Sequence, residues 1–204
     1  TVTGPNGTLQ VKEVRGRNDI IHSLELEHQL EVGDEIIGEI DWERRYSHMR
    51  MHTAQHLVSG IAYELFNGVR TVGNQIHTTH SRIDFNPISF DEEMLVKLTY
   101  ETNNMIKQNL EVTDLTLTRN EINSIMPPER TNMDLIPEFI EQLRVVKIGD
   151  EIDLCPCAGT HISNIGEIGA ISIIGKKSKG KGTQRITYEL SESNSPRNFN
   201  SSII

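Results

Sequence analysis

The sequence lacks long apolar runs and has few cysteines. Its apolar runs are only a few residues long, far short of the roughly 20 needed to span a bilayer, and its first residues show no signal-peptide pattern. We therefore expect a cytoplasmic protein with no membrane partner. The chain of 204 residues has two cysteines, Cys155 and Cys157. Because only a proline separates them, they are poor disulfide partners and are better interpreted as metal ligands or free thiols.

Positive charge is also scarce. The chain has 20 Lys and Arg against 29 Asp and Glu, a formal net charge of -9, which argues against a broad phosphate-binding surface. Four lysines nevertheless gather in the segment GKKSKGKG, at Lys176, Lys177, Lys179 and Lys181. Because strand-like segments flank it, the segment predicts a flexible basic hairpin tip that binds nucleic acid. The alternative is an ordinary solvated loop.

The pattern of the whole chain indicates an α+β fold. Residues 1–44 contain short strand-like segments at 8–14, 20–24 and 35–42, which predict a small β-barrel-like domain. Residues 45–190 alternate helical and strand-like patterns, and we expect an α/β two-layer domain with an antiparallel sheet. The Ser/Asn-rich residues 191–204 are expected to form a flexible tail.

Three helices are predicted by periodicity and capping signals. A long one begins near Arg44 with apolar residues every three or four positions, and a C-cap signal at 67–68 ends it. Capping-box spacing predicts that a second begins at Ser89, with Glu92, and that a shorter one begins at Thr118, with Glu121. The proline pair at 127–128 should end the third.

Two pairs of metal-ligand residues have the same spacing. His52 and His56 lie four apart in the long helix and project from one face, away from the apolar stripe, into solvent or a polar cleft. Cys157 and His161 lie four apart on a glycine-containing turn. Imidazole and thiolate together suit Zn²⁺. A structural zinc finger is disfavoured, because about 100 residues separate the pairs and a chain of this length has ample core without a metal.

The helical pair resembles the HExxH motif of metalloproteases only in part. That motif needs a glutamate after the first histidine as general base. Thr53 occupies this position, so protease chemistry is disfavoured.

The segments around both pairs resemble a known family. The runs DWERR (41–45) and RMHTAQHL (50–57), with CAGTHI (157–162) and NIGEIG (164–169), are similar to the editing domain of alanyl-tRNA synthetase. The likeness covers residues 1 to about 190 and includes the small β-domain of the medium-length AlaX proteins. In two places the chain departs from the motif: Ala158 stands where the family often has glycine, and Cys155 is an additional thiol.

The resemblance implies a zinc-dependent hydrolase that deacylates mischarged Ser-tRNA(Ala), and the Gly-tRNA(Ala) form is a further candidate substrate. It implies His52, His56, Cys157 and His161 as zinc ligands and mischarged tRNA(Ala) as partner, with no nucleotide cofactor. No catalytic domain for charging tRNA fits in this length. Either zinc activates water or it orients the substrate; if all four ligands bind at rest, one must yield or the coordination must expand.

Two polar residues are candidates for contacting the serine hydroxyl. Thr53 follows the first ligand, and Gln75 lies in the hairpin that faces it in the resembling domains. The alternatives are an intrahelical hydroxyl bond for Thr53 and a surface turn position for Gln75. Three other functions stay open: a zinc hydrolase with another ester or amide substrate, a tRNA-binding module with a structural zinc, and a homomeric scaffold.

Overall fold

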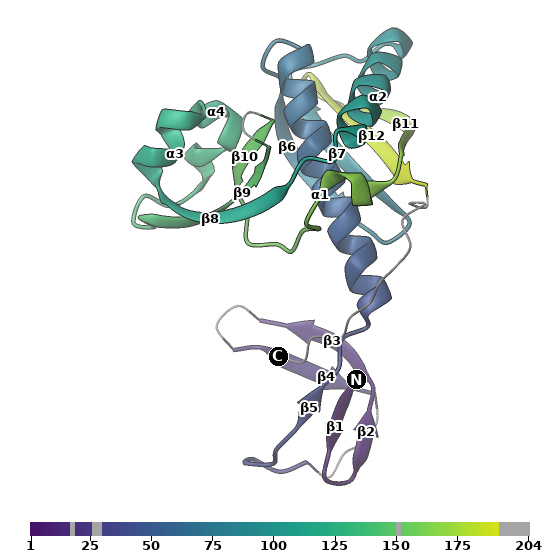
Figure 1. Ribbon diagram of the computed structural model, residues 1–204, viewed down its shortest axis with the longest axis vertical. Helices are drawn as coiled ribbons and strands as arrows, with labels where there is room; N and C mark the ends of the chain where they lie inside the picture. Colours follow the sequence, from purple (N-terminus) through teal and green to yellow (C-terminus); the bar gives the residue numbers. More distant parts are fainter. Residues whose placement is uncertain (17–18, 26–29, 150–151, 192–204) are drawn as a thin grey trace. The chain divides into compact units, whose positions relative to one another are not determined.

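The chain divides into two units, Thr1–Arg45 and Tyr46–Ile204, in a computed structural model that describes residues 1–16, 19–25, 30–149 and 152–191 (Figure 1). Apart from Ser191, the tail predicted to be flexible lies outside the described residues. Each unit is considered by itself below.

The described residues of the first unit form five short strands. The strands β1 (Val2–Gly4), β2 (Gly7–Leu9) and β5 (Ile37–Gly38) form an antiparallel sheet of order β2-β1-β5, and β3 (Val11–Arg15) pairs with β4 (Ile21–Leu24). In the described residues of this unit the strands do not close into a barrel, so that expectation is not met. The strand predicted over 35–42 is limited to Ile37–Gly38, and Trp42 already begins a helix, where Asp41 Oδ1 accepts the Arg44 N–H at 3.1 Å.

The long helix α1 runs from Trp42 to Leu65. Its end is confirmed where it was predicted: Asn67 and Gly68 both have positive φ, and the Gly68 N–H donates to the Tyr63 carbonyl at 2.9 Å. This is the αL termination typical of helix C-termini. No helix in the described ranges is both long and apolar enough to cross a membrane.

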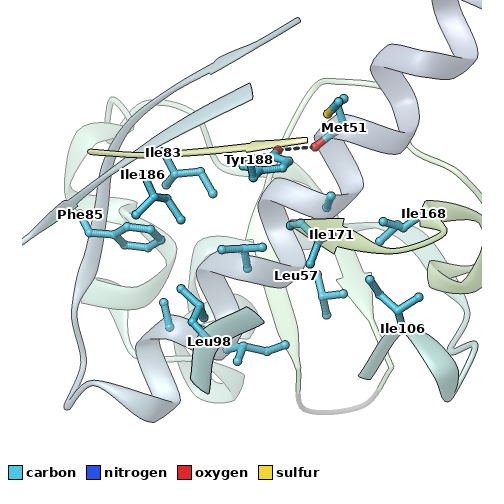
Figure 2. Close-up of a cluster of buried hydrophobic side chains, with 14 of the residues drawn as sticks. Met51, Leu57, Ile83, Phe85, Leu98, Ile106, Ile168, Ile171, Ile186 and Tyr188 are labelled. Carbon is cyan, nitrogen blue, oxygen red and sulfur yellow. Dashed lines mark hydrogen bonds between the residues drawn. The ribbon is translucent and has the colours of Figure 1, made fainter. Parts of the chain in front are cut away.

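A four-stranded antiparallel sheet supplies the other side of the main core. Its order is β11-β12-β7-β6, with β6 at Arg70–Ile76, β7 at His80–Asn86, β11 at Ile171–Gly180 and β12 at Thr183–Leu190. Alternate residues of the central strands are fully buried and point toward the helices, as Figure 2 shows for Phe85 and Ile186. The Tyr188 hydroxyl donates to the Met51 carbonyl at 2.7 Å, which ties α1 directly to β12.

Helix α2 (Glu92–Lys107) starts later than predicted. Its N-cap is Asp91, whose side chain accepts the Met94 N–H, so the prediction of Ser89 as cap is wrong. The residues before Asp91 are held in non-helical contacts: the Ile88 N–H donates to the Gly182 carbonyl and the Phe90 N–H to Gln184 Oε1. These long-range bonds outweigh the local capping signal.

A second antiparallel sheet, of order β10-β9-β8, carries a smaller core. Its strands are β8 (Val112–Thr118), β9 (Gln142–Ile148) and β10 (Asp153–Pro156). The capping box of Thr118 and Glu121 is confirmed at the start of α3 (Arg119–Ile125). The proline pair does end α3, but Pro128 also begins the short helix α4 (Pro128–Thr131), because proline is well suited to the first position of a helix. Among the described residues this unit also has two 3-10 turns, η1 (Met133–Leu135) and η2 (Ile165–Ile168).

Candidate metal centre and the cleft beside it

Helix α1 presents a polar face to a cleft. His52, His56, Ser59 and Tyr63 all line this cleft, as expected for positions that share a helix face. His56 is only 4 % exposed, so of the two environments predicted for the histidines the structure has the polar cleft and not open solvent.

The segment after β10 brings the second pair of residues to the first. The ligand atoms of His52, His56, Cys157 and His161 all lie within 4.8 Å of one another. Cys157 Sγ is 3.5 Å from His52 Nε2 and 3.9 Å from His161 Nε2. Zinc bond lengths of about 2.3 Å to sulfur and 2.0–2.1 Å to nitrogen imply roughly 3.6 Å between such atoms in a tetrahedral site. The cluster therefore has the size and ligand types of a metal site.

Two side chains fix the loop that carries Cys157 and His161. Arg144 Nη1 donates to the carbonyls of Cys157 at 2.7 Å and Gly159 at 3.0 Å. Thr53 is fully buried; its hydroxyl donates to the Met49 carbonyl at 2.9 Å and accepts the Ile162 N–H at 3.2 Å. The loop is thus tied to β9 by an arginine and to α1 by a threonine.

Glycine is required at one position of this loop. A Cβ at Gly159 would lie 2.3 Å from His52 Cε1, closer than side-chain atoms ever approach. Ala158, where the family often has glycine, is exposed. The departure at Ala158 therefore leaves the close approach of the loop to His52 intact.

The second nitrogen of His56 bonds a buried carboxylate. His56 Nδ1 lies 2.8 Å from Asp153 Oδ2, and both side chains are less than 10 % exposed, at 5 % and 8 %. Burial by itself lowers the pKa of His56, but the hydrogen bonds with Asp153 and Cys157 outweigh burial and raise this pKa to about 9. Asp153 begins β10, the strand that leads into Cys157.

The two cysteines differ strongly. Burial raises the pKa of Cys157, but its hydrogen bonds with His161, His52 and His56 outweigh burial and lower the pKa to about 3. Burial raises the pKa of the Cys155 thiol well above its usual range. Since the thiolate is the form that binds metals, these environments favour Cys157 over Cys155 as a ligand.

The cleft has a volume of about 280 Å³, at the small end of ligand pockets. A chain of hydrogen-bonded polar side chains lines it next to the histidines. Thr71 Oγ1 donates to Ser59 Oγ at 2.8 Å, Gln55 Nε2 donates to the same oxygen at 2.9 Å, and Asn74 Nδ2 lies 3.4 Å from Gln55 Oε1. The lining also includes Arg70 and Arg130. A small polar group can therefore be bound beside the histidines of the cluster.

The other predicted site residues lie outside this lining. Gln75 is exposed in β6 and accepts a hydrogen bond from Arg82. Its neighbour Asn74 reaches the cleft instead, because successive residues of a strand face opposite sides. Thr53 lies behind the cleft, among the contacts of the ligand loop.

The lysine segment is less loop-like than predicted. Strand β11 extends to Gly180, and only Lys181 and Gly182, both with positive φ, form the turn before β12. Lys176 pairs with Glu92 at 2.9 Å and donates to the Phe90 carbonyl. Lys177, Lys179 and Lys181 are exposed, so the basic tip exists as an ordered hairpin.

Sequence reasoning missed several residues that the fold brings to the site. Those that contribute polar atoms to the cleft or its ligands are Gln55, Thr71, Asn74, Arg130 and Asp153. Only Asp153 carried a local signal, since it is an acidic residue between two apolar ones, Ile152 and Leu154.

Comparison with known proteins identifies the family. The family described as "Threonyl and Alanyl tRNA synthetase second additional domain" matches residues 143–187. The "Alanyl-tRNA editing protein AlaX-M" of Saccharolobus solfataricus is 37 % identical over 187 residues, covering 89 % of this chain and 76 % of that protein. The chain belongs to the AlaX family. The AlaX-M protein of Methanosarcina mazei is 34 % identical over 177 residues, covering 84 % of this chain and 70 % of that protein.

More distant AlaX relatives include the longer AlaX-L type. The "Alanyl-tRNA editing protein AlaX-L" of Pyrococcus horikoshii is 29 % identical over 193 residues, which cover 92 % of this chain and 45 % of that protein. The family resemblance predicted from the two ligand motifs is thus confirmed.

Proposed function

We propose that this AlaX chain is a zinc-dependent deacylase that removes serine from mischarged Ser-tRNA(Ala), without itself charging tRNA. The observation that carries the proposal is the cluster of three histidines and one thiolate at the edge of a small polar cleft. The names of the relatives, alanyl-tRNA editing proteins, supply the substrate class.

The donor set of the cluster suits Zn²⁺. Its nitrogen and sulfur atoms lie within 4.8 Å of one another, and Cys157 has a depressed pKa, so it is a thiolate at neutral pH. Imidazole and thiolate are ligands that Zn²⁺ commonly takes. When bound there, zinc would supply a Lewis acid for ester hydrolysis. The chain's own residues hold the geometry: Arg144 and Thr53 fix the loop, and Asp153 bonds His56.

The polar wall of the cleft supports serine as the amino acid removed. Ser59 Oγ accepts two hydrogen bonds, from Thr71 and Gln55, so both of its lone pairs are used and its own O–H is left to donate. Ser59 lies three residues after His56 on α1, about 4.5 Å along the helix axis, and both residues line the cleft. A substrate hydroxyl could accept the hydrogen bond from Ser59, whereas alanine has no such group.

A site of this kind solves a discrimination problem. A synthetase pocket that merely tolerates an added hydroxyl cannot reject serine strongly, but a second site that hydrogen-bonds this hydroxyl can select it. Glycine has no hydroxyl either, so hydrolysis of Gly-tRNA(Ala) would depend on the metal cluster and not on Ser59.

Thr53 and Gln75 stay predictions as residues that contact the serine hydroxyl. Both bonds of the Thr53 hydroxyl are made within the protein, which supports a role in positioning the ligand loop. Gln75 is exposed beside Arg82, which supports a role in tRNA contact at the outer side of the sheet.

The exposed lysines of the β11–β12 hairpin are our candidates for binding tRNA phosphates. Lys177, Lys179 and Lys181 present three ammonium groups on an ordered tip, and ammonium groups act as point charges toward phosphates. Lys176 is also a candidate, although its ion pair with Glu92 competes.

The test is deacylation of Ser-tRNA(Ala), Gly-tRNA(Ala) and Ala-tRNA(Ala) by the purified chain, before and after removal of metal by a chelator. We expect hydrolysis of Ser-tRNA(Ala) that stops on chelation and returns with zinc, and little hydrolysis of Ala-tRNA(Ala). His56→Ala should abolish the activity and leave the protein folded but less stable, because apolar residues elsewhere on α1 keep the core while the buried Asp153 carboxylate loses its partner. His80→Ala, which removes an exposed imidazole, is the matched control. Full activity in metal-free protein or in His56→Ala would refute the proposal.

A further inference from the structure

Asp153 is a buried carboxylate with one described partner. It is 7 % exposed, and its Oδ2 lies 2.8 Å from His56 Nδ1. A carboxylate is costly to bury unless it is paired, so its place at the start of β10 calls for an explanation. The contact with His56 is at the length of a strong, charge-assisted hydrogen bond.

This bond fixes which nitrogen of His56 is free. A carboxylate only accepts hydrogen bonds, so His56 Nδ1 must carry the proton and Nε2 is left for the cluster. We propose that Asp153 is a positioning residue, which holds the tautomer and ring orientation that present His56 Nε2 to the metal. The inference deepens the proposed function, since it concerns the same zinc cluster.

The same bond links the two halves of the cluster. Asp153 begins β10, which leads directly to Cys157, whereas His56 and His52 are on α1. One side-chain contact thus joins the strand that supplies one ligand pair to the helix that supplies the other. The site is held in register before a metal enters, which lowers the ordering cost of binding.

The rings of the other two histidines in the cluster are less constrained. In the described parts of the chain, His56 is the one ligand of the four with a carboxylate on its second nitrogen, and His161 Nδ1 is buried without a partner. Asp153 therefore makes His56 the most firmly oriented histidine of the cluster.

The first measurement uses the unaltered chain. Long-range ¹H–¹⁵N correlation spectra of the zinc-loaded protein distinguish the two imidazole tautomers. We expect His56 to carry its proton on Nδ1. A His56 protonated on Nε2 and bound to zinc through Nδ1 would overturn the inference, and this result needs no variant.

The second measurement is zinc affinity, by competition with a chromophoric chelator. Asp153→Asn keeps the shape, but its amide can donate to Nδ1 and favour the wrong tautomer. Loss of such outer partners typically weakens metal binding 10- to 100-fold, and we expect this range for Asp153→Asn and Asp153→Ala. Glu189→Gln removes an exposed carboxylate from β12 and should bind zinc as the unaltered chain does. Affinities of both Asp153 variants within about twofold of this control would refute the role.

Activity then separates positioning from catalysis. If Asp153 acts through the metal, excess zinc should restore most of the deacylation rate of Asp153→Asn, whereas it should not restore His56→Ala. A rate that stays low in Asp153→Asn with the zinc site full would contradict a positioning role. An unaltered chain with the expected tautomer and no hydrolysis of Ser-tRNA(Ala) would refute the proposed function and still support this role of Asp153.

Discussion

Replacing Gly159 by alanine should damage the metal cluster while leaving the core untouched. A Cβ at this position would lie 2.3 Å from His52 Cε1 and 2.7 Å from His52 Nδ1, whereas ordinary contact starts at 3.4 Å. The loop or the imidazole must therefore move by about 1.1 Å. Metal sites tolerate deviations of only about 0.2 Å in ligand distances, so the displacement is several times too large.

The expected effects follow from that displacement. We expect zinc affinity to fall on the order of 10- to 100-fold, about 1.4–2.8 kcal/mol. Deacylation of Ser-tRNA(Ala) should fall by on the order of a hundredfold, the typical cost of a 1 Å misplacement. Zinc affinity is measured by chelator competition and the rate by release of serine under single-turnover conditions.

The neighbouring residue supplies the control. Ala158→Gly changes an exposed position of the same loop and also restores the glycine common in the family, so it should leave zinc affinity and rate within about twofold. If Gly159→Ala binds zinc and hydrolyses substrate as well as Ala158→Gly does, then His52 does not need this close approach, and the geometry argued above is refuted.

Three further predictions concern the substrate and the metal-free protein. Ser59→Ala should lower the rate with Ser-tRNA(Ala) about 2- to 10-fold, the worth of one neutral hydrogen bond, and leave Gly-tRNA(Ala) unchanged; an equal loss on both substrates would contradict hydroxyl recognition. Changing Lys177, Lys179 and Lys181 to alanine should weaken tRNA binding and reduce the slope of log K against log salt by about 0.7–0.9 for each phosphate that is no longer neutralised. An unchanged slope would show that these lysines do not bind phosphates and that the hairpin is an ordinary solvated surface. Without metal, the pKa of Cys157 is about 3 in the folded chain against an ordinary 9.0, so its stabilising effect, complete above pH 9, is lost as pH falls toward 3. Cys157→Ser should therefore make the free energy of unfolding, measured with urea, less dependent on pH between about 6.5 and 4. This range lies below the ordinary pKa of His56, so the raised pKa of His56 no longer changes stability with pH there. Equal pH dependence in both proteins would argue against a thiolate.

Local patterns in the sequence determined much of the fold. The spacing of apolar residues predicted α1, the C-cap signal at 67–68 predicted its end, and Thr118 with Glu121 predicted the start of α3. These features depend on neighbours within a few positions. The paired spacings of four residues predicted which side chains would meet, and the structure brings those four together.

Where several elements compete for one segment, local signals were not sufficient. Ser89 has the right spacing for a cap, but bonds to Gly182 and Gln184 hold the adjacent backbone out of the helix, and Asp91 caps α2 instead. The short strands of residues 1–44 likewise do not close into a barrel within their described part, because the pairing of strands is a long-range choice.

The sequence by itself therefore determined the family, the four residues that cluster and the long helix that carries two of them. Only the tertiary structure decided which side chains surround those four residues. Asn74 and not Gln75 reaches the cleft because the register of β6 on β7 sets which face each residue takes. Asp153 meets His56 across 97 positions of sequence, and no local pattern encodes a contact at that separation, since it exists only once β10 and α1 have packed together.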